Sequence, residues 1–377
     1  SCFVKFIWIW WKQHFTRFFR LLNMKIYITA TQALSPHDTF LSEKLPEKVE
    51  TIQGVMKFRL PDFRLYFNPL QRRRMSNLVK ASSVCSLECM NESGIEKPDA
   101  IIVASSLGSV EESEKFLNKL IDENAEFLTP TNFIQSNHNS LGAQIALNLG
   151  CNNYNVVYSH KTASFESALI DACMLIEDGD ARHVLVGGID EITTENYELK
   201  KSIGLWKEEL FTNLDVLNSL SPGSIPGEGV AFFVLSSEPA VNSYASICGA
   251  ALYPFSDSPE EVLGKLHAFL SASGTGPEQI DLVMTGNNGD MDSDAFTASV
   301  LNAGFQKSIH GIYKHLSGEF DTAASFGLWF ASRIMREGKI PGYARLNQVE
   351  REIRQIMIYH HDGFRNHSFI LLEKFNN

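Results

Sequence analysis

The sequence has little positive charge, and its cysteines are not clustered. Its 377 residues hold 33 Lys and Arg against 44 Asp and Glu, a formal net charge of −11. This acidic balance argues against nucleic acid as a main partner. The six cysteines lack the spacing of a zinc site or a disulfide framework. We therefore expect a reducing, cytoplasmic setting, with no metal site and no cofactor.

A membrane-spanning run is also missing from the N-terminal segment. Residues 1–23 contain three of the five Trp residues, four basic residues and no acidic one. Their unbroken apolar run, Phe6 to Trp11, is far shorter than the roughly 20 residues of a transmembrane helix. No small-residue cleavage site follows it. One interpretation is an interfacial amphipathic anchor, so membrane association depends on whether residues 1–23 belong to the protein. The favoured interpretation is a leader or miscalled start, disordered or an extra helix, before a first strand that opens at Met24.

Short apolar runs then alternate with stretches of helical periodicity. Strands are predicted at 25–30, 99–106, 155–159, 183–188, 229–235, 245–252, 280–286 and 367–375. Helices are predicted at 72–93, 111–123, 141–149, 164–178, 259–273, 293–303 and 322–336. This alternation predicts βαβ units and a largely parallel sheet in an α/β protein.

The two halves of the chain echo each other. Residues 97–121 and 278–301 share an Asp, an apolar strand, a small-residue loop and an acidic helix start. Residues 162–179 and 322–338 each contain a helix opened by Ser-Phe and closed by Gly. The echo predicts two versions of one design, residues 24–240 and 241–377, about a pseudo-twofold axis.

Several motifs follow one another between residues 129 and 235. Pro130 and Phe133 lead into a helical segment containing Asn139, and further on the chain contains Gly179-Asp180-Ala181, Gly187-Gly188 and Gly227-Glu228-Gly229. Taken alone, the Gly pair indicates a tight turn. The Gly-Glu-Gly motif indicates a close approach of the backbone beside the strand-to-helix turn, or elbow, at residues 158–172. Together, the ordered set resembles the β-ketoacyl-ACP synthases of the thiolase fold. The resemblance implies duplicated βαβ halves in a layered αβαβα architecture.

The stretch YSHKTASFESALIDA, residues 158–172, contains a strand-to-helix elbow of the kind that holds a nucleophile. By family spacing from Gly179 and Gly187, Thr162 stands where the resemblance implies the nucleophilic cysteine. A threonine hydroxyl needs an adjacent base, whereas a thiol at a helix N-terminus ionises readily. The elbow therefore does not carry the family's nucleophile.

The two active-site histidines that the resemblance implies are missing as well. The loop after the strand at 280–286 runs Thr285-Gly286-Asn287-Asn288-Gly289, with no histidine between His267 and His310. In the segment that resembles Lys-x-x-x-Gly-His, Lys314 is retained and Glu319 replaces the histidine. A carboxylate there would repel the enolate formed during condensation.

Loss of all three catalytic side chains resembles the chain-length-factor subunits of type II polyketide systems and of aryl polyene or flexirubin-like pigment clusters. The resemblance implies a heterodimer with a Cys-bearing ketosynthase, or a homodimer, that works with an acyl carrier protein. Two alternatives stay open. One is an active 3-oxoacyl-ACP synthase or acyltransferase that uses Thr162 with His160, or a displaced Cys151. The other is a carrier-protein or acyl-chain binding module.

Three side chains are implied at the acyl pocket by the same resemblance. Phe133 and His138, in the segment 129–141, are expected to reach the pocket of the partner subunit, and Phe364 is expected at a gate position. Packing alone would also explain Phe364. Arg72-Arg73-Arg74 would suit an acidic carrier protein, although a solvated helix start is the other interpretation. His360-His361-Asp362 lacks the further ligands of a metal site.

Overall fold

A computed structural model describes residues 19–122, 130–256, 258–363 and 366–375. Within these ranges no helix is long and apolar enough to cross a membrane. Residues 1–18 of the expected leader lie outside the described residues. Residues 19–23 are not disordered and not helical as expected, because the first strand already begins at Phe19 and its opening residues pair with a central strand of the sheet.

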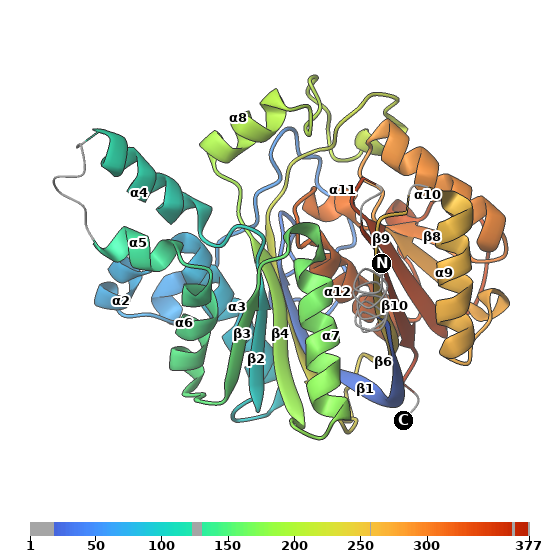
Figure 1. Cartoon of the computed structure of the whole chain (residues 1–377), viewed down its shortest axis with the longest axis horizontal. Helices are drawn as coiled ribbons and strands as arrows, with labels where there is room; N and C mark the ends of the chain where they lie inside the picture. Colours follow the sequence, from blue (N-terminus) through green and yellow to red (C-terminus); the bar gives the residue numbers. More distant parts are fainter. Residues whose placement is uncertain (1–18, 123–129, 257, 364–365, 376–377) are drawn as a thin grey trace, which may run out of the picture.

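Ten strands form one continuous sheet (Figure 1). Its order is β3-β2-β4-β5-β1-β6-β10-β9-β7-β8. The bounds are β1 Phe19–Leu34, β2 Ala100–Ala104, β3 Tyr154–Tyr158, β4 His183–Asp190, β5 Gly229–Ser236, β6 Ala245–Pro254, β7 Leu282–Thr285, β8 Ile309–Ile312, β9 Gln355–His361 and β10 Asn366–Glu373. The sheet is mixed and not largely parallel as the sequence predicts, because β4, β5, β1, β6, β10 and β9 pair antiparallel in succession.

The two halves of the sheet have the same strand order. In residues 19–236 the order from the edge of the sheet to its centre is third, second, fourth, fifth and first strand, and residues 245–373 have the same order from the opposite edge to the centre. The parallel pairs fall at equivalent places, β3-β2-β4 and β8-β7-β9. Parallel neighbours need a long crossover connection, which the helices provide.

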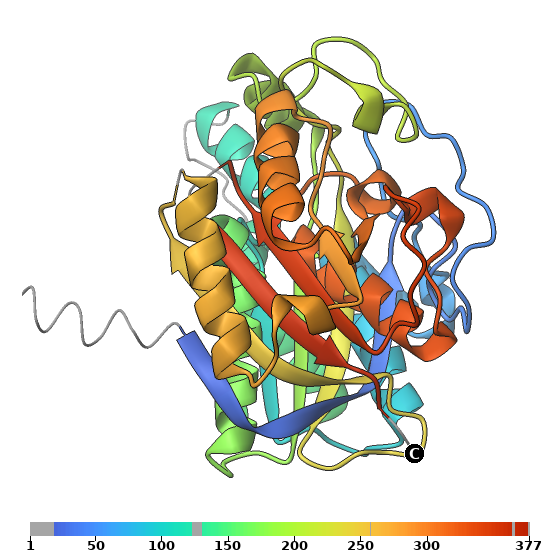
Figure 2. The same cartoon turned by 90° about the vertical axis from the view of Figure 1, so that its right-hand side faces the viewer.

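Helices cover both faces of each half (Figures 1 and 2). They are α2 Pro69–Arg74, α3 Asn77–Ser93, α4 Val110–Asp122, α5 Pro130–Ser136, α6 Asn139–Leu149, α7 Ser164–Glu177, α8 Thr194–Ser202, α9 Pro259–Ala272, α10 Met291–Gly304, α11 Lys314–Ser317 and α12 Ala323–Glu337. The amphipathic pairs α3/α6 and α9/α10 pack outside, each on its own half. Helices α7 and α12 lie inside, in one apolar core with strands of both halves. The result is a layered α/β fold.

Five of the described elements fall outside the predicted pattern: β8, β9, α5, α8 and α11. Strand β8, with the sequence IHGI, is short and interrupted by Gly, so it shows no alternation of polar and apolar residues. Strand β9, QIMIYHH, ends in two histidines, yet six of its seven residues are buried. Burial between β10 and β7 makes β9 a strand, and parallel pairing with β7 makes β8 one, and sequence spacing reveals neither.

Two histidines, His37 and His315, are buried in the protein. Among the described residues, their ring nitrogens have no hydrogen-bond partners. Burial, with a smaller effect of His37, lowers the pKa of His315 to about 3. An unfolded histidine titrates near pH ~6.5. The neutral ring therefore contributes stability above that pH, and this contribution is lost as the pH falls toward 3.

We expect the unfolding free energy of the native chain to fall more steeply in acid than that of His315→Phe. The difference in slope between pH 6 and pH 4 should approach about 1.4 kcal/mol per pH unit. Urea unfolding at each pH measures it. His267→Phe, a change at an exposed histidine of α9, is the control and should leave the slope unchanged. Equal slopes for the native chain and His315→Phe would contradict the assignment.

Candidate functional site

The elbow lies between β3 and α7, as the sequence predicts. The turn Lys161–Ala163 joins them, and Lys161 adopts a left-handed backbone with φ +49°. Such a conformation is strained for a residue with a side chain and is typical of functional turns. Ser164 holds the turn, since its Oγ accepts from the backbone N–H of His160 at 2.7 Å and donates to the carbonyl of Lys161 at 2.5 Å.

Thr162 is half-buried in this elbow and faces a carboxylate. Its Oγ1 donates a hydrogen bond to Oδ2 of Asp362, a residue that directly follows β9. Asp362 also accepts from the backbone N–H and the side-chain amide of Asn366, at 2.7 and 3.0 Å. The ring of His160, the base considered for Thr162, is not the partner of its hydroxyl. A thiolate at this position would lie beside a negative charge, which disfavours the anion.

A chain of polar side chains runs from α7 into the sheet. Glu166 and His360 are 3% and 4% exposed, and the carboxylate Oε1 lies 3.1 Å from the imidazole Nδ1. Ser368 donates to the same oxygen at 2.9 Å. The other ring nitrogen of His360 lies 3.3 Å from Nζ of Lys314. Both imidazole nitrogens are therefore engaged within the protein.

The same set of polar side chains continues to Lys314 and Glu319, the segment that the sequence predicts to correspond to the family's Lys-x-x-x-Gly-His motif. Nζ of Lys314 lies 2.5 Å from Oε2 of Glu319, and Asn288 donates its side-chain amide to the same oxygen at 2.6 Å. The lysine side chain is 2% exposed and the glutamate 18%. A buried ammonium needs such a partner, because leaving it unpaired costs several kcal/mol. We name Glu166, His360, Lys314, Glu319 and Asn288 the buried polar chain.

The histidine-free loop after β7 is packed against this chain. A Cβ on Gly286 would lie 2.8 Å from Cδ2 of His360 and 3.4 Å from Cε of Lys314. The site thus contains an imidazole that enters from β9. The sequence does not predict that His360 belongs to this site. The local signal for it is its position shortly before Gly363 and Phe364. Asp294 fixes the loop by accepting the backbone N–H groups of Asn288 and Gly289 at 3.1 and 2.9 Å.

Gly227 allows the backbone to come close to Glu319, as the Gly-Glu-Gly motif predicts. A Cβ at this position would lie 2.1 Å from the carbonyl oxygen of Ser317. Reciprocal hydrogen bonds join the two segments, with Gly227 N–H donating to the Glu319 carbonyl at 2.9 Å and Glu319 N–H donating to the Ile225 carbonyl at 2.8 Å. The position of Glu319 is therefore fixed by its backbone.

The remaining predicted residues lie in different surroundings. Phe133, on α5, is 61% exposed and packs against Phe116 of α4 with ring centroids 5.3 Å apart. His138 lies nearer the elbow, since its Nε2 is 3.4 Å from the carbonyl oxygen of Ser106, which also accepts from Ser159 Oγ at 2.9 Å. Phe364 lies outside the described residues.

Cys151 cannot replace Thr162 as a nucleophile. It is 6% exposed, its Sγ lies 3.4 Å from the carbonyl of Pro98, and it precedes β3 at the end away from the elbow. Five residues of strand span roughly 16 Å. Cys173 is buried in the central core. A displaced Cys151, one of the alternatives left open by the sequence, is therefore excluded as a nucleophile at the elbow. The position of Cys173 excludes that thiol as well.

Among the described residues, Thr162 lines a small pocket with Glu166, His360, Asp362 and Ser368, and the cavity volume of this pocket is about 0 Å³. An acyl thioester has no room to reach the Thr162 hydroxyl unless these side chains move.

Residues 60–203 match the protein family described as beta-ketoacyl synthase, N-terminal domain. The structure superposes on the ishigamide ketosynthase/chain length factor with a TM-score of 0.74 and 15% identity, covering 94% of this chain and 100% of that one. Residues 60–203 are therefore similar to the N-terminal domain of β-ketoacyl synthases, and the chain as a whole shares the fold of a ketosynthase.

Two further solved structures share the ketosynthase fold. A beta-ketoacyl synthase from Burkholderia phymatum STM815 matches with a TM-score of 0.72 and 13% identity over 94% of this chain and 100% of that one. Ketosynthase twelve of the bacillaene polyketide synthase from Bacillus amyloliquefaciens matches with a TM-score of 0.67 and 13% identity over 94% and 74%. None of the curated proteins compared matches in sequence. At these identities the likeness concerns the fold, which is the thiolase-like one expected.

Proposed function

We propose that this β-ketoacyl synthase-like chain is a non-condensing, chain-length-factor-type partner of an active ketosynthase in fatty acid or polyketide biosynthesis, of the aryl polyene or flexirubin-like kind. The observation that carries the proposal is that the polar side chains at the elbow are hydrogen bonded to one another. Thr162 is hydrogen bonded to Asp362, and the buried polar chain engages both nitrogens of His360 and the ammonium of Lys314. No thiol stands there, and neither imidazole nitrogen is free to donate to a substrate.

Decarboxylative condensation needs donors aimed at the developing enolate, in a site without competing negative charge. Glu166, Glu319 and Asp362 instead bring three carboxylates to the elbow region, against the buried Lys314 and the exposed Lys161 of the turn. Electrostatics of this sign disfavour an enolate and a nucleophilic anion alike. The arrangement suits a structural role for the site.

Three features support the partnership with a ketosynthase. Strand β3 forms an edge of the sheet, with Tyr154 43% exposed. Figure 1 shows α5 and α6 on the same side of the molecule as β3. On α5, Phe133 and Ile134 are 61% and 62% exposed. One structure that shares the fold is named as a ketosynthase/chain length factor. The repeated strand order further supports duplicated halves, residues 24–240 and 241–377.

An acyl carrier protein completes the proposal. Helix α2 carries Arg72, Arg73 and Arg74 in its last turn, and the latter two are exposed. Basic side chains on an acidic protein would attract an acidic carrier and orient it. On this proposal, Phe133 and His138 act at the acyl tunnel of the complex and Phe364 at its gate.

The purified chain is expected to form no acyl-enzyme when incubated with an acyl-carrier protein, because the Thr162 hydroxyl is hydrogen bonded to the weakly basic carboxylate of Asp362 and not to an imidazole. Intact-mass spectrometry tests this, with a Cys-bearing ketosynthase as the positive control. A stoichiometric acyl adduct that disappears in Thr162→Ala would contradict the proposal.

A further inference from the structure

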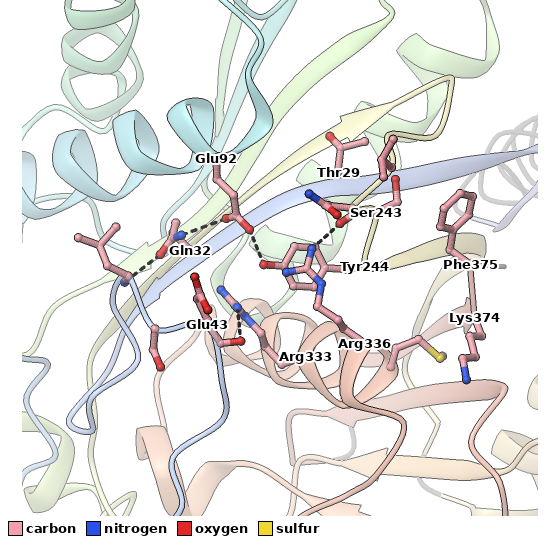
Figure 3. A pocket seen from close by; sticks show the side chains of 15 residues that line it. Thr29, Gln32, Glu43, Glu92, Ser243, Tyr244, Arg333, Arg336, Lys374 and Phe375 are labelled. Atoms are coloured by element: carbon pink, nitrogen blue, oxygen red, sulfur yellow. Dashed lines mark hydrogen bonds between the residues drawn. The ribbon is translucent and has the colours of Figure 1, made fainter. Parts of the chain in front are cut away.

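A large cavity lies at the far end of α12 from the elbow (Figure 3). Glu319 lies just before the first turn of α12, whereas Arg333 and Arg336 lie in its last turns, about 15 Å further along the helix axis. The cavity has a volume of about 660 Å³. This size lies within the roughly 300–1,000 Å³ of small-molecule pockets. Its walls come from β1, α12, the end of α3, the loop before β6 and the residues after β10.

Arg333 is a buried cation in this wall whose hydrogen bonds go to neutral groups. It is 2% exposed, and its two terminal nitrogens donate to the carbonyls of Glu43 and Thr31, each at 3.2 Å. Within the described part of the chain its Nε has no hydrogen-bond partner. Taking a guanidinium out of water without a carboxylate or phosphate partner is costly. The residue is therefore prepared for an anion.

A second guanidinium lies on the same aromatic ring. The guanidinium carbons of Arg336 and Arg333 lie 3.3 and 4.9 Å from the ring centroid of Tyr244. Figure 3 shows both side chains extending from α12 toward this ring. Arg336 is exposed and also donates to the carbonyl of Asn242. Stacking on Tyr244 restricts both arginines, which lowers the entropy lost when they bind a ligand.

One carboxylate of the cavity wall, that of Glu92, is already engaged. Glu92 accepts from the Tyr244 hydroxyl through one oxygen, and through the other from the Thr31 N–H and the Gln32 amide at 3.2 and 3.0 Å. Glu43 also lines the cavity but is exposed, so water screens its charge. With Lys374 at the rim, three cations face two carboxylates.

Apolar side chains border the cavity beside the charged groups. Leu41 and Val241 are 53% and 81% exposed, and Phe375 lines the same wall. We propose that this cavity binds a small organic anion, with its carboxylate or phosphate held by Arg333 and Arg336 and its apolar part against Leu41, Val241 and Phe375. The site is separate from the elbow and does not depend on the function proposed for it.

Isothermal titration calorimetry of the full chain tests this site with three probes at constant ionic strength: hexanoate, hexyl phosphate and hexanol. At least one anion is expected to bind with a Kd near or below ~1 mM, and hexanol to bind at least tenfold more weakly. Binding of hexanoate alone identifies a carboxylate site, and binding of hexyl phosphate alone a phosphate site.

Two variants and one control locate the binding. Arg336→Gln, on the exposed side of the cavity, is expected to raise the Kd at least tenfold. Arg333→Lys keeps the charge but loses the planar fork and should weaken binding as well. Arg64→Gln, at an exposed arginine paired with Asp62, should leave the Kd unchanged, and an unchanged Tm shows that each variant is folded.

Three outcomes would overturn the proposal. They are anion binding weaker than ~10 mM, hexanol binding as tightly as the anions, and an unchanged Kd in folded Arg336→Gln.

Discussion

Co-expression of this chain with a Cys-bearing ketosynthase is expected to give a stable 1:1 heterodimer, with a homodimer when the chain is expressed alone. An edge strand with unpaired N–H and C=O groups needs a cover, and β3 presents such an edge. Pairing of β3 with its counterpart would continue the sheet across a twofold or pseudo-twofold axis. We expect the interface to bury more than the ~2,000 Å² of obligate partners. Size-exclusion chromatography with native mass spectrometry measures the stoichiometry.

Val156→Glu is the variant that probes this interface. Val156 is half-buried in the middle of β3, and a carboxylate there would be left in an apolar contact without a partner. The heterodimer fraction is expected to fall at least tenfold. Leu346→Glu changes a side chain that is 46% exposed beside β8, at the opposite edge of the sheet from β3, and should have no effect. A monomer both alone and after co-expression would contradict the proposed assembly.

Thr162→Cys is expected to restore less than about a thousandth of the condensation rate of an active ketosynthase. General acid–base and oxyanion groups each contribute about 10²–10³-fold or more. The variant still lacks a free imidazole, and Glu319 keeps a carboxylate where a neutral donor is required. Carbon dioxide release from malonyl-carrier protein measures the turnover.

The same variant should acquire an acyl group slowly, because Asp362 disfavours the thiolate. The double variant Thr162→Cys, Asp362→Asn removes this charge and is expected to acylate faster in an intact-mass time course. Thr162→Ser is the matched control and should remain unmodified. Condensation by Thr162→Cys within tenfold of an active ketosynthase would show that the catalytic positions are wrongly assigned.

Local sequence patterns were sufficient for the elbow and the helices around it. The change from an apolar strand to helical spacing after Tyr158 predicts the turn at Lys161–Ala163, and spacing from Gly179 and Gly187 assigns Thr162 a place in it. Both signals depend on residues within about 25 positions of one another. The positive φ of Lys161 could not be anticipated, because lysine carries no preference for a left-handed backbone.

The partners of those residues come from the other half of the chain. Thr162 meets Asp362 across 200 residues, and Glu166 meets His360 across 194. No periodicity or spacing connects such pairs, so the sequence predicted neither the hydrogen bond at the elbow nor the imidazole beside Gly286. They meet because β9 packs in the sheet beside β10 with its C-terminal end near the start of α7.

The sequence by itself determined the α/β class, the order of the main strands and helices, and the presence of a threonine in the elbow turn, because each is a property of residue type at a local position. Only the tertiary structure decided the mixed pairing of the ten strands, the closed polar surroundings of Thr162 and the cation-lined cavity at the end of α12. These depend on contacts between residues far apart in the chain, and such contacts form only when the whole sheet closes around α7 and α12.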